Sequence, residues 1–173
     1  MNKEIEKDVF IKVIKIDTSD DCVTSTKAYD EVRMLAQEQF GLKDLNIVKN
    51  ELGRPYFSNH SEIDMSISHT DGMIAVVVAS GKKVGIDVEK IHKINDMIID
   101  KYYSDLEKKI LCDEKQDYET GATLIWTRKE AYSKYIGTGL TRDLIKADMI
   151  KRSDVSFFGE RVDQYLVSIC VGT

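Results

Sequence analysis

The chain has 173 residues, about the length of one compact domain. Hydrophobic residues make up 42% and charged residues 32%, which is typical of a globular protein and too apolar for a disordered one. Because 25 Lys and Arg stand against 30 Asp and Glu, the net charge is −5. That balance argues against broad binding to a phosphate backbone, so no nucleic-acid partner is expected. A small local basic pocket remains compatible with it.

The sequence also bears on where the protein works. The longest unbroken apolar run, Met73 to Ala79, is far too short to cross a membrane. The opening MNKEIEKD lacks the apolar core of a signal peptide. We therefore expect a cytoplasmic protein with no membrane partner. The cysteines Cys22, Cys112 and Cys170 are widely separated, which predicts reduced thiols and no metal or redox motif.

The hydrophobic pattern predicts an α+β fold. Alternating or continuous apolar runs predict strands over residues 9–16, 45–48, 56–57, 63–68, 73–80, 84–89, 155–158 and 161–171. Helical periodicity predicts helices over residues 25–40, 94–103, 105–113 and 118–136. Thr24 or Ser25 is the expected cap of the first helix, and Gly41 and Gly137 are the expected stops.

The order of these elements suggests two lobes. The first half holds one long helix and several strands, while the second half opens with helices and ends in strands. We expect one unit over residues 1–173, with approximate lobes at 1–89 and 90–173 that meet near Glu89. The single proline, Pro55, and the lack of a Gly- or Ser-rich tract give no sign of a flexible linker.

The segment Val84 to Glu89 places two carboxylates on one face of a strand. Asp87 and Glu89 are two residues apart and point the same way, opposite to Ile86 and Val88. Adjacent carboxylates repel each other, and a divalent cation relieves the repulsion. The segment is therefore a candidate metal site, and a solvated strand face is the alternative.

A second candidate lies on the helix predicted over residues 118–136. Trp126, Glu130 and Lys134 lie four residues apart on one stripe of this helix, with Lys129 beside it. The simple alternative is an exposed Glu–Lys pair that stabilises the helix by about a few tenths of a kcal/mol. A tryptophan is less usual on a stripe that is merely solvated.

A third candidate is the strand-to-turn segment from Ser66 to Gly72. Ser68, His69 and Thr70 supply hydroxyls and an imidazole, which suit phosphate oxygens. Arg54 adds a cation in the turn Gly53-Arg54-Pro55. Ordinary surface turns are the alternative for both segments.

Five short segments occur in a specific order: G-R-P at 53–55, S-I-S-H at 66–69, V-G-I-D-V-E at 84–89, Y-Y-S-D-L-E at 102–107 and W-T-R-K-E-A-Y-S-K at 126–134. Together they resemble the 4′-phosphopantetheinyl transferase superfamily. These enzymes move the 4′-phosphopantetheine arm of coenzyme A to a serine of a carrier protein and release adenosine 3′,5′-bisphosphate. The 83 residues before Val84 are similar to the surfactin-type branch. That branch packs two similar α/β half-domains of one chain as a pseudo-dimer, whereas the short synthase branch forms trimers.

The resemblance implies a magnesium-dependent holo-[acyl-carrier-protein] synthase in which Asp87, Glu89 and Glu130 bind Mg²⁺. It also implies that Lys134 stabilises the phosphates. Deprotonation of the incoming serine would fall to Glu130, to Glu107 or to a metal-bound water. The sequence leaves this choice open.

The resemblance further implies a coenzyme A site. Arg54, Ser68 and His69 would contact the phosphates together with Lys134, while Lys129 and Trp126 would bind at the site or support it. For the 3′-phosphate the sequence offers only residues 24–27, at the expected start of a helix.

The implied partners are coenzyme A and an apo acyl or peptidyl carrier protein, from fatty-acid, polyketide or nonribosomal-peptide biosynthesis. A monomer is expected, because two halves of one chain would replace the subunit interface. The alternative is a non-catalytic module that binds coenzyme A or a carrier protein on the same fold.

Overall fold

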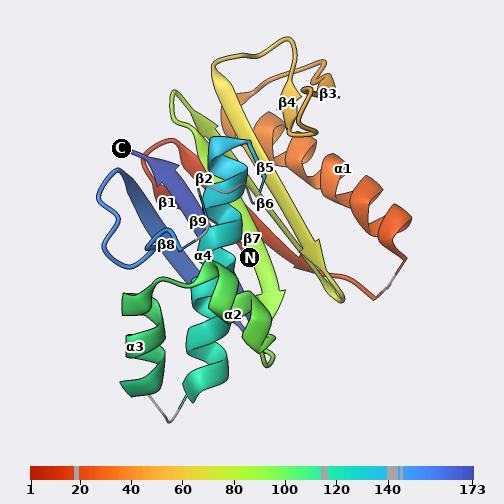
Figure 1. Cartoon of the computed structure of the whole chain (residues 1–173). Helices are drawn as coiled ribbons and strands as arrows, with labels where there is room; N and C mark the ends of the chain where they lie inside the picture. The colour runs from red at the N-terminus through yellow and green to blue at the C-terminus, as the bar shows by residue number, and fades with distance from the viewer. Residues whose placement is uncertain (18–19, 114–116, 140–143, 145) are drawn as a thin grey trace.

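The computed structural model describes residues 1–17, 20–113, 117–139, 144 and 146–173. The elements follow one another as β1 (Asn2–Glu6), β2 (Val9–Lys15), α1 (Asp21–Phe40), β3 (Ile47–Lys49), β4 (Pro55–Phe57), β5 (Ile63–Thr70), β6 (Met73–Ser80), β7 (Val84–Lys90), α2 (Asp96–Tyr102), α3 (Asp105–Asp113), α4 (Tyr118–Ile136), β8 (Val155–Val162) and β9 (Tyr165–Gly172) (Figure 1). This mixture of helices and antiparallel sheets confirms the α+β class.

Two sheets form the centre of the molecule. The first has the strand order β1-β2-β6-β5, the second has the order β7-β9-β8, and β3 and β4 form a separate hairpin. Alternate residues of β2 and β6 pack against alternate residues of β7 and β9 in one core cluster. On the outer faces, α1 covers the first sheet and α4 lies over β7 and β9, as Figure 1 shows. Each half of the chain thus contributes a sheet and a covering helix.

The apolar run in β6 is explained by its central position. Its odd-numbered residues, from Met73 to Ala79, face the second sheet. Its even-numbered residues, Ile74, Val76 and Val78, face α1. A strand that is buried on both faces has no need to alternate polar with apolar residues.

Sequence and structure differ at the N-terminal elements. α1 begins at Asp21, before the predicted start, and its cap is Asp20 rather than Thr24 or Ser25. The Asp20 carboxylate accepts hydrogen bonds from the backbone of Cys22 at 2.9 Å and Val23 at 3.2 Å. β1 was not predicted, because a segment as polar as N-K-E-I-E carries no strand signal. Both predicted stops are confirmed: Gly41 and Gly137 are left-handed C-caps.

The two sheets also meet edge to edge. Side chains of β5 reach the backbone of β7, where Asp64 Oδ2 accepts the N–H of Val84 at 2.8 Å and Ser66 Oγ accepts that of Ile86 at 3.2 Å. β7 itself pairs with β9 and therefore lies in the C-terminal sheet, although the predicted lobe 1–89 includes it. The exact division into lobes stays a prediction. In the described part of the chain, no helix has the length and apolarity needed to cross a membrane.

Candidate active site

Asp87, Ser68 and Lys134 form a hydrogen-bonded triangle where β7, β5 and α4 meet. Lys134 Nζ donates to Asp87 Oδ1 and to Ser68 Oγ, each at 2.8 Å, and Ser68 Oγ donates to the same Asp87 oxygen at 2.8 Å. The Asp87 side chain is only 6% exposed, whereas Lys134 is 30% exposed. The triangle therefore joins a buried carboxylate to a cation that still reaches solvent.

A close approach of α4 to β7 makes this meeting possible. A Cβ atom on Gly85 would lie 2.1 Å from the carbonyl oxygen of Ala131 and 2.5 Å from the amide nitrogen of Tyr135. Only glycine fits there, so the helix lies directly on the strand. As predicted from the strand period, Asp87 faces α4 while Val84, Ile86 and Val88 face the opposite sheet.

The described residues use only part of the hydrogen-bonding capacity of the Asp87 carboxylate. Its second oxygen, Oδ2, is buried and has no hydrogen-bond partner among the described residues. The carboxyls of Glu89 and Glu130, when ionised, have the same negative charge as Asp87 and are repelled by it. Burial, followed by the charge of Asp87, raises the pKa of Glu89 to about 6 and that of Glu130 to about 7. A cation bound by these carboxylates would lower the repulsion among them.

The donor chemistry of this site fits a hard divalent cation. The site offers three carboxylates, and one of them has an oxygen to which no described residue donates. Mg²⁺ binds such carboxylate oxygens, with water or phosphate oxygens completing its coordination. The side chains are nevertheless not gathered around one point: within the described ranges, no group of three or more His, Cys, Asp or Glu is arranged to hold a metal ion. Instead, the ammonium of Lys134 lies on Asp87 Oδ1.

Arg54 lies beside the triangle, where its guanidinium donates hydrogen bonds to backbone carbonyls and to a carboxylate of other elements. Its Nε donates to the carbonyl of Lys134 at 2.9 Å, and its Nη2 donates to Asp64 Oδ2 at 2.7 Å and to the carbonyl of Val84 at 3.1 Å. Gly137 leaves room for this side chain, since a Cβ there would lie 3.0 Å from Arg54 Cδ. Arg54 thus ties the end of α4 to β5 and β7.

A pocket of about 230 Å³ opens next to Arg54. Lys134 belongs both to the triangle and to the wall of this pocket. Its lining comes from the turn before β4, from β5 and from the end of α4: Leu52, Gly53, Arg54, Pro55, Ser66, Ile67, Ser133, Lys134, Gly137 and Gly139. The pocket combines apolar walls with two cations, which suits an anionic ligand with an organic body.

His69 does not join the triangle. It pairs across the sheet with Ile74, which faces α1, whereas Ser68 pairs with Ala75, which faces the second sheet. Cross-strand partners share a face, so Ser68 and His69 point to opposite sides of β5. The predicted contact of His69 with phosphate stays a prediction.

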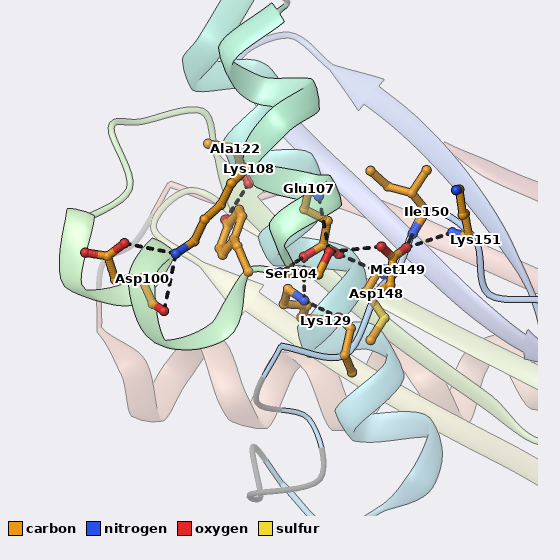
Figure 2. Close-up of polar contacts among 12 residues, drawn as sticks. Asp100, Ser104, Glu107, Lys108, Ala122, Lys129, Asp148, Met149, Ile150 and Lys151 are labelled. Carbon is orange, nitrogen blue, oxygen red and sulfur yellow. Dashed lines mark hydrogen bonds and ion pairs between the residues drawn. The ribbon is translucent and has the colours of Figure 1, made fainter.

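Glu107 of α3 and Lys129 of α4 form a second ion pair (Figure 2). Both side chains are completely buried, and Lys129 Nζ lies 2.9 Å from Glu107 Oε2. The same oxygen accepts the N–H of Ser104, and Oε1 accepts that of Met149, both at 2.8 Å. Ser104 Oγ in turn accepts the N–H of Glu107 at 3.1 Å, which completes a capping box at the start of α3.

This geometry corrects two sequence-based expectations. A general base needs a free oxygen within reach of the substrate, and Glu107 has neither a free oxygen nor solvent access. Lys129 points to Glu107 and to the carbonyl of Ala147 rather than to the triangle, and burial lowers its pKa. Both residues hold α3, α4 and residues 147–149 together. The spacing Ser104-x-x-Glu107 is the capping-box signal that sequence reasoning overlooked.

Two further expectations are resolved. Trp126 packs edge-on against Tyr102, with ring centroids 5.7 Å apart, in the core between α2 and α4. It therefore supports the helix from which Glu130 and Lys134 project. Residues 24–27 lie inside α1, whose first turn is capped by Asp20. They are not at the helix start, so the expected anion site does not form there.

Comparison with known proteins identifies the family. The model of the 4′-phosphopantetheinyl transferase superfamily matches residues 83–170, just over half of the chain. The chain belongs to this superfamily. The matched region contains Asp87, Glu89, Glu130 and Lys134, and it begins just before β7.

Three curated relatives of this chain are themselves named 4′-phosphopantetheinyl transferases. The 4′-phosphopantetheinyl transferase gsp of Aneurinibacillus migulanus is 33% identical over 93 residues, which are 53% of this chain and 38% of that protein. Sfp of Bacillus subtilis strain 168 is 28% identical over 116 residues, 65% of this chain and 51% of its own. AcpT of Salmonella typhimurium is 27% identical over 130 residues, 73% of this chain and 67% of its own. These relatives confirm the resemblance to the surfactin-type branch, although the chain spans only 38% of the length of gsp and 51% of that of Sfp.

Among solved structures, the holo-[acyl-carrier-protein] synthase of Thermotoga maritima overlaps with part of the chain. Sequence identity is 20%, the TM-score is 0.39, and the overlap covers 52% of this chain and 62% of the other. Family membership therefore rests on the match to the sequence model.

Proposed function

We propose that this protein transfers the 4′-phosphopantetheine arm of coenzyme A to a serine of an apo acyl or peptidyl carrier protein. The reaction would depend on Mg²⁺ and release adenosine 3′,5′-bisphosphate. The observation that carries the proposal is the buried Asp87: its Oδ2 has no donor in the described part of the chain, and burial and like charge raise the pKa values of Glu89 and Glu130. All three carboxyls lie within the stretch that matches the family.

Phosphoryl-group transfer of this kind depends on positioning and on stabilisation of charge. Asp87, Glu89 and Glu130 would hold the magnesium ion, which would neutralise charge on the departing bisphosphate. Lys134 would stabilise the same phosphates, since its ammonium is the solvent-accessible member of the triangle. The pocket beside Arg54 would take part of the coenzyme A molecule.

Of the side chains that could accept the proton of the incoming serine, Glu130 is the better placed. Its carboxyl lies in the electrostatic neighbourhood of Asp87 and Lys134, whereas Glu107 is enclosed. Glu130 and a metal-bound water would therefore be the two candidates for this proton transfer.

Assembly and location follow from the same proposal. The helix–sheet–sheet–helix arrangement within one chain supports a monomer with two lobes, because both large sheets already cover each other. The cysteines are free thiols, which suits the reducing cytoplasm.

A transfer assay tests the proposal. The protein is incubated with coenzyme A, Mg²⁺ and apo-carriers from fatty-acid, polyketide and nonribosomal-peptide systems, and each carrier is weighed by mass spectrometry. We expect the mass of the phosphopantetheine arm to appear on at least one carrier and to be absent when EDTA is added. If no carrier is modified while coenzyme A still binds, the chain is a binding module and the proposal fails.

A further inference from the structure

We propose that Ser68 is a positioning residue for Asp87: it holds the carboxylate so that Oδ2 stays available to a divalent cation. The inference rests on the proposed function, since it concerns the same metal site. It differs from the role expected from sequence, in which Ser68 contacts the phosphates of coenzyme A.

The direction of each hydrogen bond in the triangle follows from chemistry. An ammonium group can only donate, so Ser68 Oγ accepts from Lys134 Nζ at 2.8 Å. The single hydroxyl hydrogen of Ser68 then goes to Asp87 Oδ1, also at 2.8 Å. Because Lys134 donates to this same oxygen, both donors lie on Oδ1. The carboxylate is fixed about its last torsion, with Oδ2 turned away from both.

Because both residues are buried, the Ser68–Asp87 hydrogen bond is hard to replace. Ser68 is 6% exposed and Asp87 is 4% exposed, so bulk water has little access to replace a lost donor. Without the hydroxyl, Lys134 alone would hold the carboxylate, and an ammonium can follow either oxygen as it turns. Removing a group that hydrogen-bonds to a metal ligand and orients it typically weakens metal affinity by about 10- to 100-fold.

Ser68 also differs from its neighbours on the same face of β5. Asp64 and Ser66 accept backbone N–H groups of β7 and so join the edges of the two sheets. Ser68 instead donates to a side chain of β7. This hydrogen bond therefore spans the same two edges and, in addition, acts on the Asp87 carboxylate.

The phosphate role expected from sequence requires a hydrogen that Ser68 does not have free. Phosphate oxygens need donors, and a serine hydroxyl has one. That hydrogen lies on Asp87 Oδ1. The lone pair left on Ser68 Oγ would repel a phosphate oxygen rather than bind it.

The chain offers a matched control in Ser168. This serine is fully buried, lies directly across the β7–β9 ladder from Asp87, and its hydroxyl contacts Thr127 at 2.7 Å instead of the carboxylate. Thr127 keeps a second hydrogen bond, to the carbonyl of Leu124, when Ser168 is changed. Ser168→Ala thus removes a buried hydroxyl from the same neighbourhood without touching Asp87.

The test measures Mn²⁺ binding to the purified, EDTA-treated whole chain by electron paramagnetic resonance, with Mn²⁺ standing in for Mg²⁺ as a hard cation. The variants are Ser68→Ala and Ser168→Ala, together with the pair Ser68→Thr and Ser68→Val, which have the same shape and differ only in the hydroxyl. Circular dichroism monitors folding and thermal midpoint. The Thr and Val pair decides the outcome if the alanine variant does not fold.

We expect Ser68→Ala to raise the Kd for Mn²⁺ by about 10- to 100-fold, with Ser168→Ala within about twofold of the wild type. Ser68→Thr should bind at least about tenfold more tightly than Ser68→Val, at a similar thermal midpoint. If Ser68→Ala binds Mn²⁺ like the wild type, or if Ser168→Ala loses as much, the inference is wrong while the proposed function stands. If the wild type binds no Mn²⁺, both the inference and the metal dependence of the proposed function are overturned.

Discussion

Two lysines on α4 meet buried carboxylates in opposite ways. Lys129 and Glu107 are both inaccessible to solvent, and each oxygen of Glu107 has a donor. Lys134 is 30% exposed, and its partner Asp87 has one oxygen to which no described residue donates. Both lysines lie on α4, and Lys134 also lines the pocket next to Arg54.

The difference separates a structural ion pair from a functional one. A buried network in which every group is satisfied holds elements together and has no capacity left for a ligand. A buried oxygen without a donor is costly, and a ligand or ion that satisfies it is one physical reason for such an oxygen. The comparison predicts that changes at Asp87 affect chemistry and that changes at Glu107 affect stability.

The largest effect is expected at Asp87. Asp87→Asn should lower the transfer rate by about a thousandfold or more, because it removes a charge that the metal needs and several kcal/mol of charge stabilisation with it. Mass spectrometry of the carrier gives the rate, and circular dichroism verifies the fold. A rate near that of the wild type would remove Asp87 from the site.

Breaking the other pair should affect stability instead. Glu107→Gln leaves the Lys129 ammonium buried without its counter-ion, which should lower the free energy of unfolding by about 3–5 kcal/mol. Urea denaturation measures this loss. The double variant Glu107→Gln with Lys129→Met should recover part of it, since no charge then remains buried. A single variant as stable as the wild type would mean that the pair contributes little.

A smaller effect is expected from Glu130 in the metal-free protein. The pKa of this carboxyl is raised from 4.5 to about 7, so the folded state holds a proton that the unfolded state has lost between these pH values. Its contribution to stability is complete below pH 4.5 and disappears as the pH rises through 7. Glu130→Gln should remove that dependence and stabilise the EDTA-treated protein at pH 8 by about 1–3 kcal/mol.

Urea denaturation at pH 5 and pH 8 checks the sign of this effect. Glu51→Gln, at an exposed position before Arg54, serves as a control that should leave both values unchanged. A Glu130→Gln protein that is less stable than the wild type at pH 8 would contradict the raised pKa.

The smallest effect is expected at a surface pair close to Glu107. Lys108 lies 3.0 Å from Asp100, but the aspartate side chain is 80% exposed (Figure 2). Lys108→Ala should change the free energy of unfolding by less than about 1 kcal/mol, because water screens the charges. A loss as large as that of Glu107→Gln would show that burial is not what distinguishes the two pairs.

Much of this arrangement could be predicted from the sequence. The helix 118–136 was predicted with both of its ends, and the strand period correctly placed Asp87 on the face opposite to Ile86 and Val88. Local pattern fixes such features, because they depend on residues close together in the chain.

The rest depends on contacts between distant segments. The pattern put Lys129 and Lys134 on neighbouring stripes, but it could not tell which lysine α3 would cover. Likewise, nothing in S-I-S-H shows that Ser68 will meet Asp87 while His69 turns toward α1, since the packing of β5 beside β7 decides this. β1 escaped prediction because its strand pairing with β2 outweighs a polar sequence.

The two sites are compared most simply by the rate of phosphopantetheine transfer per folded molecule, measured for Asp87→Asn and Glu107→Gln with coenzyme A, Mg²⁺ and a carrier that the wild type modifies. Both changes turn a paired carboxylate into its amide. We predict that Asp87→Asn loses transfer by about a thousandfold, while folded Glu107→Gln stays within about tenfold of the wild type. An equal loss in both variants, or a greater loss at Glu107, would contradict the assignment of the chemistry to the Asp87 site.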